Sequence, residues 1–211
     1  MAKGEAGERE SYHHKGLRLA LISAADAILR ERGVEGFTLR EAARRAGVSA
    51  AAPGHHFGNS AGLLTEIAIL GFEELTRSLQ QASTIEPPTT RLRAQGIAYA
   101  RFALTHPGRF HLMFRHDLLL AEDDRLKARG ESALGELEQT IRALRALPPD
   151  QPINGASRAV LLGVWSTVHG FAHLALDGKF DRLGPGTPPM ELLATTLPEV
   201  LLALWPDAEV A

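Results

Sequence analysis

The side chains best suited to a recognition function lie between residues 38 and 57, and they suit contact with DNA. In this segment, TLREAARRAGVSAAAPGHHF, the hydroxyl of Thr38 and the carboxylate of Glu41 have the spacing of a capping box, which predicts a helix start. Gly47 can end that helix in the left-handed conformation, and Ser49 can cap a second helix. Two short helices joined this closely predict a helix-turn-helix.

The second helix of such a pair presents its N-terminal part to the major groove of DNA. Small side chains there allow close approach and contact with thymine methyl groups, and a histidine can meet a base edge or a phosphate. Free backbone amides beside a serine suit a phosphate. The predicted DNA contacts from this segment are Thr38, Arg40, Ser49, Ala50, Ala51, Gly54, His55 and His56. On spacing alone, an ordinary packed pair of helices is the alternative.

Composition narrows the classes to which the chain can belong. Its 211 residues, with 45% apolar and 23% charged side chains, predict a soluble globular protein. The absence of cysteine rules out disulfide bonds, thiolate metal sites and zinc fingers, and it fits a reducing cytoplasm. We find no apolar run near the roughly 18–20 residues of a membrane span and no secretory core after the polar start. We therefore expect a cytoplasmic protein with no membrane partner.

Catalysis is not indicated by the sequence. It contains no glycine-rich phosphate loop, no serine nucleophile elbow and no carboxylate pair in a catalytic context, so we expect no enzymatic activity and no cofactor. His169 and His173 have the four-residue helical spacing of two metal ligands. Because no third ligand is arranged nearby in the sequence, we predict satisfied histidines and no metal site.

The distribution of charge favours the N-terminal part as the DNA-binding part. The net charge of −2 argues against tight binding to nucleic acid, because affinity for DNA comes largely from neutralising phosphates. Residues 1–60, however, contain nine Lys or Arg against seven Asp or Glu, whereas the remainder contains fourteen against eighteen. We therefore expect moderate DNA affinity that falls as salt concentration rises.

Apolar spacing predicts an all-α fold of about nine helices. A polar tail over residues 1–14 precedes a supporting helix over 17–32, and Asn59 and Ser60 cap a long helix that runs to about residue 83. Five further helices are predicted over residues 90–105, 109–117, 122–147, 156–176 and 190–204.

We place a domain boundary near residue 60. Residues 1–60 then form a three-helix domain that comprises the N-terminal arm and the helix-turn-helix, and residues 61–211 form a larger helical domain. Phe102, Phe110, Met113 and Phe114 lie close together in the sequence of the larger domain, with Tyr99 nearby. Such a cluster is what an adaptable apolar pocket needs, and it is also what any helical core needs.

The N-terminal pattern as a whole resembles the tetracycline-repressor (TetR) family of bacterial transcription regulators. The resemblance runs from about residue 17 to 75 and rests on AADAILRERGVEGFTLREAARRAGVS, followed by AAP, HHF, GLL and GFEEL at fixed spacing. It implies DNA binding as a homodimer through residues 1–60, with residues 61–211 as a ligand-binding and dimerisation domain that holds a small-molecule effector. It also implies backbone contacts from an N-terminal arm, for which Lys15 and Arg18 are best placed; a disordered terminus is the alternative.

Two positions depart from the pattern of that family. The family commonly has a tyrosine where this chain has Gly54 and a lysine where it has Ser60, and both usually contact the DNA backbone. Gly54 also lowers helix propensity, and Pro53 removes one backbone donor from the same helix. We therefore expect a recognition helix that is mobile or is ordered mainly by Phe57 packing and by DNA.

A second, shorter resemblance lies in the stretch VWSTVHGFAHLALDG. Trp165, His169 and Gly170 are similar to a TetR subgroup recognised by a Trp, His and Gly grouping. Gly170 inside a helix indicates close approach of another helix. With this resemblance, the expected ligand-binding residues are Tyr99, Phe102, Phe110, Met113, Phe114, Trp165 and His169. Paired with the apolar helix over 190–204, this helix is expected to form a two-fold dimer interface.

These patterns together predict a ligand-responsive transcriptional regulator, a repressor by family habit. Its partners would be a palindromic operator in double-stranded DNA, a second copy of the chain and a small apolar or amphipathic effector that releases it from DNA. The alternative is a helical ligand-binding or interaction protein with weakened DNA binding, because Gly54 and Ser60 replace residues that usually contact phosphates.

Overall fold

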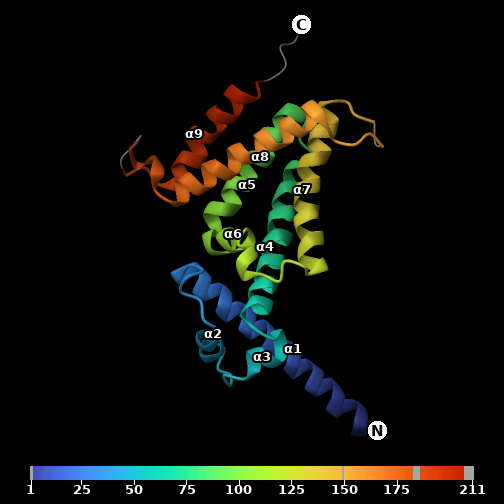
Figure 1. The fold of residues 1–211 in the computed structure, drawn as a ribbon, viewed down its shortest axis with the longest axis vertical. Coiled ribbons are helices and arrows are strands. Elements are labelled where there is room, and N and C mark those ends of the chain that lie inside the picture. Colours follow the sequence, from blue (N-terminus) through green and yellow to red (C-terminus); the bar gives the residue numbers. More distant parts are fainter. Residues whose placement is uncertain (1, 149, 183–185, 207–211) are drawn as a thin grey trace. The chain divides into compact units, whose positions relative to one another are not determined.

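The computed structural model describes residues 2–148, 150–182 and 186–206, with side chains described from residue 16 onward. Within these residues the chain forms nine α-helices and two short 3-10 helices and has no β-strand, which confirms the predicted all-α fold (Figure 1). The α-helices are α1 (Ala2–Arg32), α2 (Leu39–Arg45), α3 (Ala52–Phe57), α4 (Ser60–Ala82), α5 (Pro88–Thr105), α6 (Pro107–Met113), α7 (Asp124–Leu144), α8 (Gly155–Leu176) and α9 (Pro189–Leu204). The 3-10 helices are η1 (His116–Leu118) and η2 (Lys179–Arg182).

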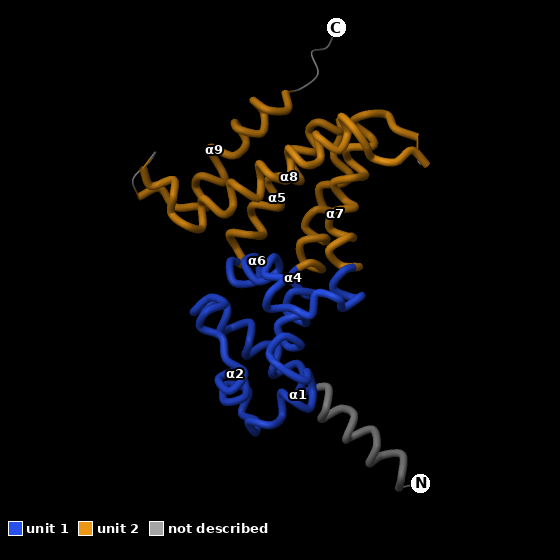
Figure 2. The backbone as a smooth tube through the Cα atoms, viewed as in Figure 1, with its two compact units in different colours: residues 1–71, 107–127 blue, residues 72–106, 128–211 orange. Residues whose placement is uncertain are grey.

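The helices divide into two compact units, between which the chain passes more than once (Figure 2). Unit 1 comprises residues 1–71 and 107–127, and unit 2 comprises residues 72–106 and 128–211. The long helix α4 contributes its first half to unit 1 and its second half to unit 2. The predicted boundary near residue 60 divides the chain by function, and that division stays a prediction.

Unit 1 is built on α1, against which α2 and α6 both pack. The buried face of α1 follows the apolar stripe expected from the sequence and comprises Leu21, Ile22, Ala25, Ile28 and Leu29. Gly108 allows α6 to lie close to α1, because a Cβ atom at this position would lie 2.5 Å from the carbonyl oxygen of Leu29. Arg109, the next residue, binds both carboxylate oxygens of Asp26 at 2.7 and 2.8 Å.

Unit 2 is centred on α5, which packs against both α8 and α9. Gly96 allows this approach, because a Cβ atom there would lie 3.0 Å from Val168 and 3.1 Å from Leu201. A cluster of buried side chains from α5, α7 and α8 continues the core; it comprises Leu92, Ile141, Leu161 and Val164. Burying side chains of this size contributes about 1.5–3 kcal/mol each, so apolar packing accounts for most of the cohesion of unit 2.

Several helix boundaries differ from the predictions. α1 begins at Ala2, so residues 2–14 of the predicted polar tail belong to a helix. Extending an existing helix costs far less than nucleating a new one. α6 begins at Pro107, two residues earlier than predicted, because proline suits the first turn of a helix. Asn154 precedes α8 as predicted, but its side chain makes no capping hydrogen bond.

α8 is the one described helix that is long and apolar enough to cross a membrane, which corrects the prediction that no such run exists. This result rests on length and composition, and the core helix of a soluble protein meets the same criteria. Only 33% of its most apolar window is buried. The prediction that another helix lies close to Gly170 is wrong for the described residues. A Cβ atom at Gly163 or Gly170 would meet no heavy atom within 4 Å. One face of α8 is therefore open.

Candidate functional site

The helix-turn-helix predicted from the sequence is present as α2 and α3, and α2 begins where the capping pattern indicates. Thr38 has an extended backbone, and its Oγ1 accepts a hydrogen bond from the backbone N–H of Glu41 at 3.2 Å. The reciprocal half of the predicted capping box is replaced, because the Glu41 carboxylate accepts charge-assisted bonds from Arg44 and Arg45. The hydrogen bonds from Arg44 and then Arg45 lower the pKa of Glu41 to about 2.

A Schellman motif ends α2 and sets the turn to α3. Gly47 has a φ of 69°, as its predicted left-handed role requires. Its N–H donates to the carbonyl of Arg44 at 3.2 Å, and the N–H of Val48 donates to the carbonyl of Ala43 at 3.0 Å. These two bonds satisfy carbonyl groups that the end of a helix would otherwise leave without partners.

α3 starts two residues later than predicted. Its N-cap is Ala51, which makes no side-chain capping bond, so the prediction that Ser49 caps this helix is wrong. Pro53 accounts for the later start, because its fixed φ and missing N–H suit the first turn of a helix. Pro53 removes one backbone donor as predicted, but in the first turn that donor would have had no partner within the helix. Whether α3 is mobile stays a prediction.

The edge predicted to face DNA is exposed. Ala50, Ala51, Gly54 and His55 are all exposed, and His56 is half-buried. A Cβ atom at Gly54 would meet no heavy atom within 4 Å, so the outer side of α3 is open to close approach by another molecule. This placement is what contact with a base edge or a thymine methyl group requires, although the contacts themselves stay predictions.

Among the basic residues of α2, Arg40 differs from the other two. Arg44 and Arg45 both bind Glu41, and Arg45 also binds Glu31 at 2.8 Å. Arg40 is exposed, and among the residues whose side chains are described it has no ion pair. It is therefore the arginine of α2 most available to a phosphate. The side chain of Lys15 lies outside the described residues.

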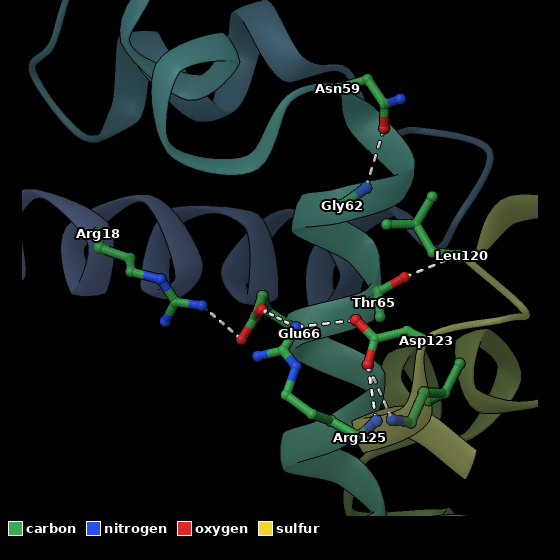
Figure 3. A network of polar contacts seen from close by, with 9 residues as sticks. Arg18, Asn59, Gly62, Thr65, Glu66, Leu120, Asp123 and Arg125 are labelled. Carbon is green, nitrogen blue, oxygen red and sulfur yellow. Dashed lines mark hydrogen bonds and ion pairs between the residues drawn. The ribbon is translucent and has the colours of Figure 1, made fainter.

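Thr38 and Ser49 are also exposed. Thr38 precedes α2, and Ser49 lies in the turn between α2 and α3. The hydroxyl of Thr38 already accepts the capping bond from Glu41, so a contact with DNA would add to that bond. The predicted cap of the next helix is confirmed at Asn59, whose Oδ1 accepts from the N–H of Gly62 at 3.0 Å (Figure 3). Ser60, the first residue of α4, is exposed.

Arg18 joins the end of α3 to α4 within unit 1. Its guanidinium carbon lies 5.2 Å from the centroid of the Phe57 ring, and its Nη2 lies 2.6 Å from Oε2 of Glu66. Glu66 also accepts from Arg125 at 2.7 Å, and Arg125 binds Asp123 at 2.9 Å (Figure 3). Burial raises the pKa of Glu66, but the hydrogen bonds from Arg125 and Arg18 outweigh it, so this pKa lies below its ordinary value.

This network gives Arg18 a role that the sequence analysis did not anticipate. The guanidinium of Arg18 contacts the ring of Phe57, the last residue of α3, whereas the prediction assigned this arginine to a phosphate of DNA. Its side chain is 37% exposed, so it retains a water-facing part, and the phosphate contact stays a prediction.

The polar part of the predicted effector site comes together in unit 2. The hydroxyl of Tyr99 on α5 lies 2.8 Å from Nδ1 of His169 on α8, and the ring of Trp165 meets the His169 ring edge-on at 6.4 Å. Burial raises the pKa of Tyr99, and a hydrogen bond with Trp165 partly offsets the rise. Burial, followed by the nearby His173, lowers the pKa of His169. The site thus favours a neutral phenol beside a neutral imidazole.

The remaining predicted effector residues divide between the two units. Phe102 belongs to unit 2, where its ring lies 5.4 Å from the ring of His106. Phe110, Met113 and Phe114 belong to unit 1. Phe110 and Met113 are fully buried there, and Met113 packs against Gly71 of α4. These two residues serve the core of unit 1, and a role for them in ligand binding stays a prediction.

A cluster of buried polar side chains in unit 2, formed around Gln95 on α5 and Glu136 on α7, was not predicted from the sequence. Both side chains are buried, with exposed fractions of 2% and 8%. A signal for Gln95 was present, because the residue lies between Leu92 and Tyr99 on the apolar face of its helix. No comparable signal marks Glu136, because α7 carries many acidic and basic residues and periodicity alone does not distinguish the buried one.

The sequence matches two family models that together cover most of both units. Residues 21–67 match the model of bacterial regulatory proteins of the tetR family, and residues 92–198 match the tetracyclin repressor-like C-terminal domain. A search of curated protein sequences gives no match.

Solved structures with the same fold include a TetR family regulator, a protein in complex with operator DNA and a protein described as having unknown function. A protein described as having unknown function, from Rhodococcus sp. RHA1, is 30% identical, has a TM-score of 0.71, and covers 90% of this chain and 95% of its own. The TetR family regulator PfmR from Thermus thermophilus is 21% identical, with a TM-score of 0.65 and coverages of 90% and 96%. AibR, solved with isovaleryl coenzyme A and operator DNA, is 17% identical, with a TM-score of 0.64 and coverages of 90% and 98%.

Proposed function

This chain belongs to the TetR family of bacterial regulatory proteins, and on that premise we propose that it binds a palindromic operator as a homodimer and leaves it when a small molecule binds. The observation that carries the proposal is the exposed outer side of the helix-turn-helix. Gly54 and His55 on α3 and Arg40 on α2 are exposed together on elements that the family model covers. Small side chains there permit close approach to bases, and Arg40 supplies charge for a phosphate.

The proposed homodimer would use the open faces of α8 and α9. Leu162 and Leu174 on α8 and Leu202 on α9 are between 45% and 48% exposed, although they are large apolar side chains. Gly163 and Gly170 leave open space on α8, which lets a second helix approach closely. A second copy of the chain would cover these residues and present two recognition helices to successive major grooves.

The proposed effector site lies in unit 2, around Tyr99, Phe102, Trp165 and His169. Three of these residues are already joined by a hydrogen bond and ring contacts. The effector would be apolar or amphipathic. Its binding would move α4, the helix that contributes to both units. AibR, a protein with the same fold, binds isovaleryl coenzyme A and operator DNA, which supports an effector site in such a fold. We also place the chain in the Trp-His-Gly subgroup, as a cytoplasmic repressor without enzymatic activity.

Binding of fluorescent DNA duplexes, selected from a random library with the purified protein, tests the proposal. We expect one palindromic sequence to be enriched and its affinity to fall steeply with salt. Arg40→Ala should weaken binding about five- to tenfold and reduce the salt slope by about one. Arg101→Ala removes the same charge from an exposed position of α5 in unit 2 and should leave affinity unchanged. Enrichment of no sequence would contradict the proposal.

A second function has one specific observation in its favour. Gly54 and Ser60 are exposed and lack the phenol and the ammonium group that the family commonly has at these two positions. The second candidate function is therefore a helical ligand-binding protein with weakened DNA binding. The double variant Gly54→Tyr and Ser60→Lys separates the two cases, because the space beside Gly54 is open. If DNA binding is weakened in this chain, the variant should gain affinity at least tenfold. If other residues already hold DNA, the gain should be small.

Sedimentation of two leucine variants tests the homodimer. Leu174→Arg places a charge on the open face of α8 and should give a folded monomer with weakened operator binding. Leu120→Arg is the matched control, because Leu120 is similarly exposed, at 43%, but lies in unit 1. A Leu174→Arg protein that remains dimeric would exclude this face as the interface.

A further inference from the structure

Unit 2 contains a cluster of buried polar side chains that neither the proposed DNA contacts nor the proposed dimer interface includes. Its centre is the Glu136 carboxylate on α7, whose Oε1 accepts from Gln80 Nε2 at 2.9 Å and whose Oε2 accepts from Ser83 Oγ at 2.8 Å. Thr140 and Gln95 surround the backbone carbonyl of the same residue, to which both donate at 3.3 Å. Three helices of unit 2, namely α4, α5 and α7, therefore supply or adjoin this group.

The charge of this carboxylate is not balanced by a cation. Both donors to Glu136 are neutral, and among the residues whose side chains are described none forms an ion pair with it. Carboxylates are seldom buried unless they are paired with a cation, because desolvation of an ion costs more than neutral hydrogen bonds return. The arrangement therefore has the capacity to accept a positive charge.

Gln95 supplies a second acceptor that lacks a partner in the described part of the chain. Its Nε2 donates to Ser83 Oγ at 3.2 Å and to the carbonyl of Glu136 at 3.3 Å, whereas its Oε1 is buried and has no hydrogen-bond partner there. Turning the carboxamide round would set an oxygen against the Glu136 carbonyl, so the observed orientation is the favoured one. A buried acceptor without a donor is uncommon in folded proteins, and it indicates an absent partner.

The two acceptors define the chemistry of that partner. A buried carboxylate and a nearby carboxamide oxygen call for a group with a positive charge and at least two N–H donors, which a primary ammonium provides. Gln95 shares the buried face of α5 with Tyr99, one turn further along, and with the apolar Leu92 on the other side. A ligand that reaches both acceptors from the Tyr99 region would therefore need an apolar body behind its cationic end.

We propose that Glu136 and Gln95 form the polar end of the effector site and that the effector carries a primary ammonium group on an apolar body. This inference rests on the proposed function, since it names the class of molecule to which the regulator responds. Glu136 would balance the charge of the ammonium, and Gln95 Oε1 would accept one of its N–H groups. An anionic effector would meet the carboxylate and be rejected.

Calorimetric titration with three eight-carbon probes tests the proposal on the full-length protein. Octylamine, which is protonated at pH 7, should bind at least tenfold more tightly than octanol, and octanoate should bind least. Glu136→Gln should weaken octylamine binding at least tenfold and leave octanol binding unchanged. Gln80 is exposed and can turn its own carboxamide to suit the new side chain, so the variant should fold. Glu131→Gln, an exposed change on the same helix, is the matched control.

The thermal stability of the ligand-free variants distinguishes this proposal from a purely structural role. If the Glu136 carboxylate serves to bind a ligand, it should destabilise the ligand-free protein, and Glu136→Gln should raise Tm. If the carboxylate has a structural role, Glu136→Gln should lower Tm. Gln95→Met removes the acceptor without a partner and should also weaken octylamine binding. Equal affinity for the three probes, or no detectable octylamine binding, would overturn the proposal. A Gln95 Oε1 that accepts only from a buried water would give that result.

DNA binding, measured on the same proteins, separates this inference from the proposed function. Operator binding without octylamine binding would refute the ammonium site and leave the regulator intact. Octylamine binding that depends on Glu136, in a protein that selects no DNA sequence, would support the site and refute the regulator. Under both proposals, octylamine should lower the affinity for the selected operator, and Glu136→Gln should abolish that effect.

Discussion

The two compact units hold their helices together by different chemistry. In unit 1, ion pairs join one helix to another: Asp26 on α1 binds Arg109 on α6, and Glu66 on α4 binds both Arg18 and Arg125. In unit 2, α5 meets α8 and α9 through apolar side chains around Gly96. The ion pair between Glu73 on α4 and Arg129 on α7 is more exposed than the pair between Asp26 and Arg109, and the buried carboxylate of the unit has only neutral partners among the described residues.

The difference follows from the size of the elements that each unit must position. α3 has six residues and a single buried one, Pro53, so burial alone cannot orient it. Directional contacts such as Arg18 over Phe57 supply what burial does not. The long helices of unit 2 bury many apolar side chains, so their packing depends less on directional contacts.

The largest difference between the units should appear when a glycine in each is replaced by alanine. Gly108→Ala in unit 1 would place a Cβ atom 2.5 Å from the backbone oxygen of Leu29, so α6 must move, at a cost of about 3 kcal/mol. Gly96→Ala in unit 2 meets the ends of the Val168 and Leu201 side chains at 3.0 and 3.1 Å, which can shift. Because alanine also favours the helix by about 1 kcal/mol, this change should be nearly neutral.

Urea unfolding of both variants measures this contrast. Equal losses in the two units would mean that the backbone contact at Gly108 is no more rigid than the side-chain contact at Gly96. The two units would then not differ in how tightly their helices are fixed.

The next effect concerns the ion pair between α1 and α6. Asp26→Asn keeps the shape of the side chain but removes the charge from a bidentate, mostly buried pair with Arg109, whose two distances are 2.7 and 2.8 Å. We expect a loss of about 1–2 kcal/mol that shrinks in high salt. Asp181→Asn, at an exposed position of unit 2, should change stability by less than about 0.5 kcal/mol. A loss that does not depend on salt would indicate packing instead of charge.

A smaller effect is expected for the support of the recognition helix. Arg18→Gln removes the contact with the Phe57 ring and the ion pair with Glu66, which together contribute about 1 kcal/mol. Amide hydrogen exchange across α3 should therefore become about fivefold faster, and operator affinity should fall by a similar factor. Arg30→Gln, an exposed change on the same helix, should alter neither. Unchanged exchange in Arg18→Gln would show that α3 is ordered without this arginine.

Local signals in the sequence predicted the fold and the start and end of α2, because each depends on residues only a few positions apart. Thr38 caps the helix and Gly47 ends it as expected. The start of α3 was wrong, because Ser49 and Pro53 both mark helix starts and the covalent constraint of proline prevailed over an optional side-chain bond.

Long-range partners could not be predicted. Asp26 and Arg109 are 83 positions apart, and nothing near either residue in the sequence selects the other. The same holds for Arg18, whose position before the recognition helix suggested a phosphate while its observed contacts are with Phe57 and Glu66. Charged side chains near a DNA-reading helix have several possible partners, and only the packing of the helices decides between them.

The smallest expected effect is a difference in the pH at which the two units begin to lose stability. The pKa of His169 lies below its ordinary value of 6.5, first because of burial and then because of His173. As pH falls below 6.5, the unfolded chain takes up a proton that the folded chain does not, so unit 2 should lose stability there. The pKa of Glu66 in unit 1 lies below its ordinary value of 4.5, so the corresponding loss in unit 1 should begin only below pH 4.5.

Thermal unfolding between pH 7 and pH 5 tests this separation, with tryptophan fluorescence as the signal because Trp165 and Trp205 both lie in unit 2. His169→Gln should flatten the decline in Tm over this range, since the replaced side chain no longer titrates. His116→Gln removes an exposed histidine of unit 1 and should leave the decline unchanged. If His169→Gln declines as steeply as the unmodified protein, another group governs the pH response of unit 2.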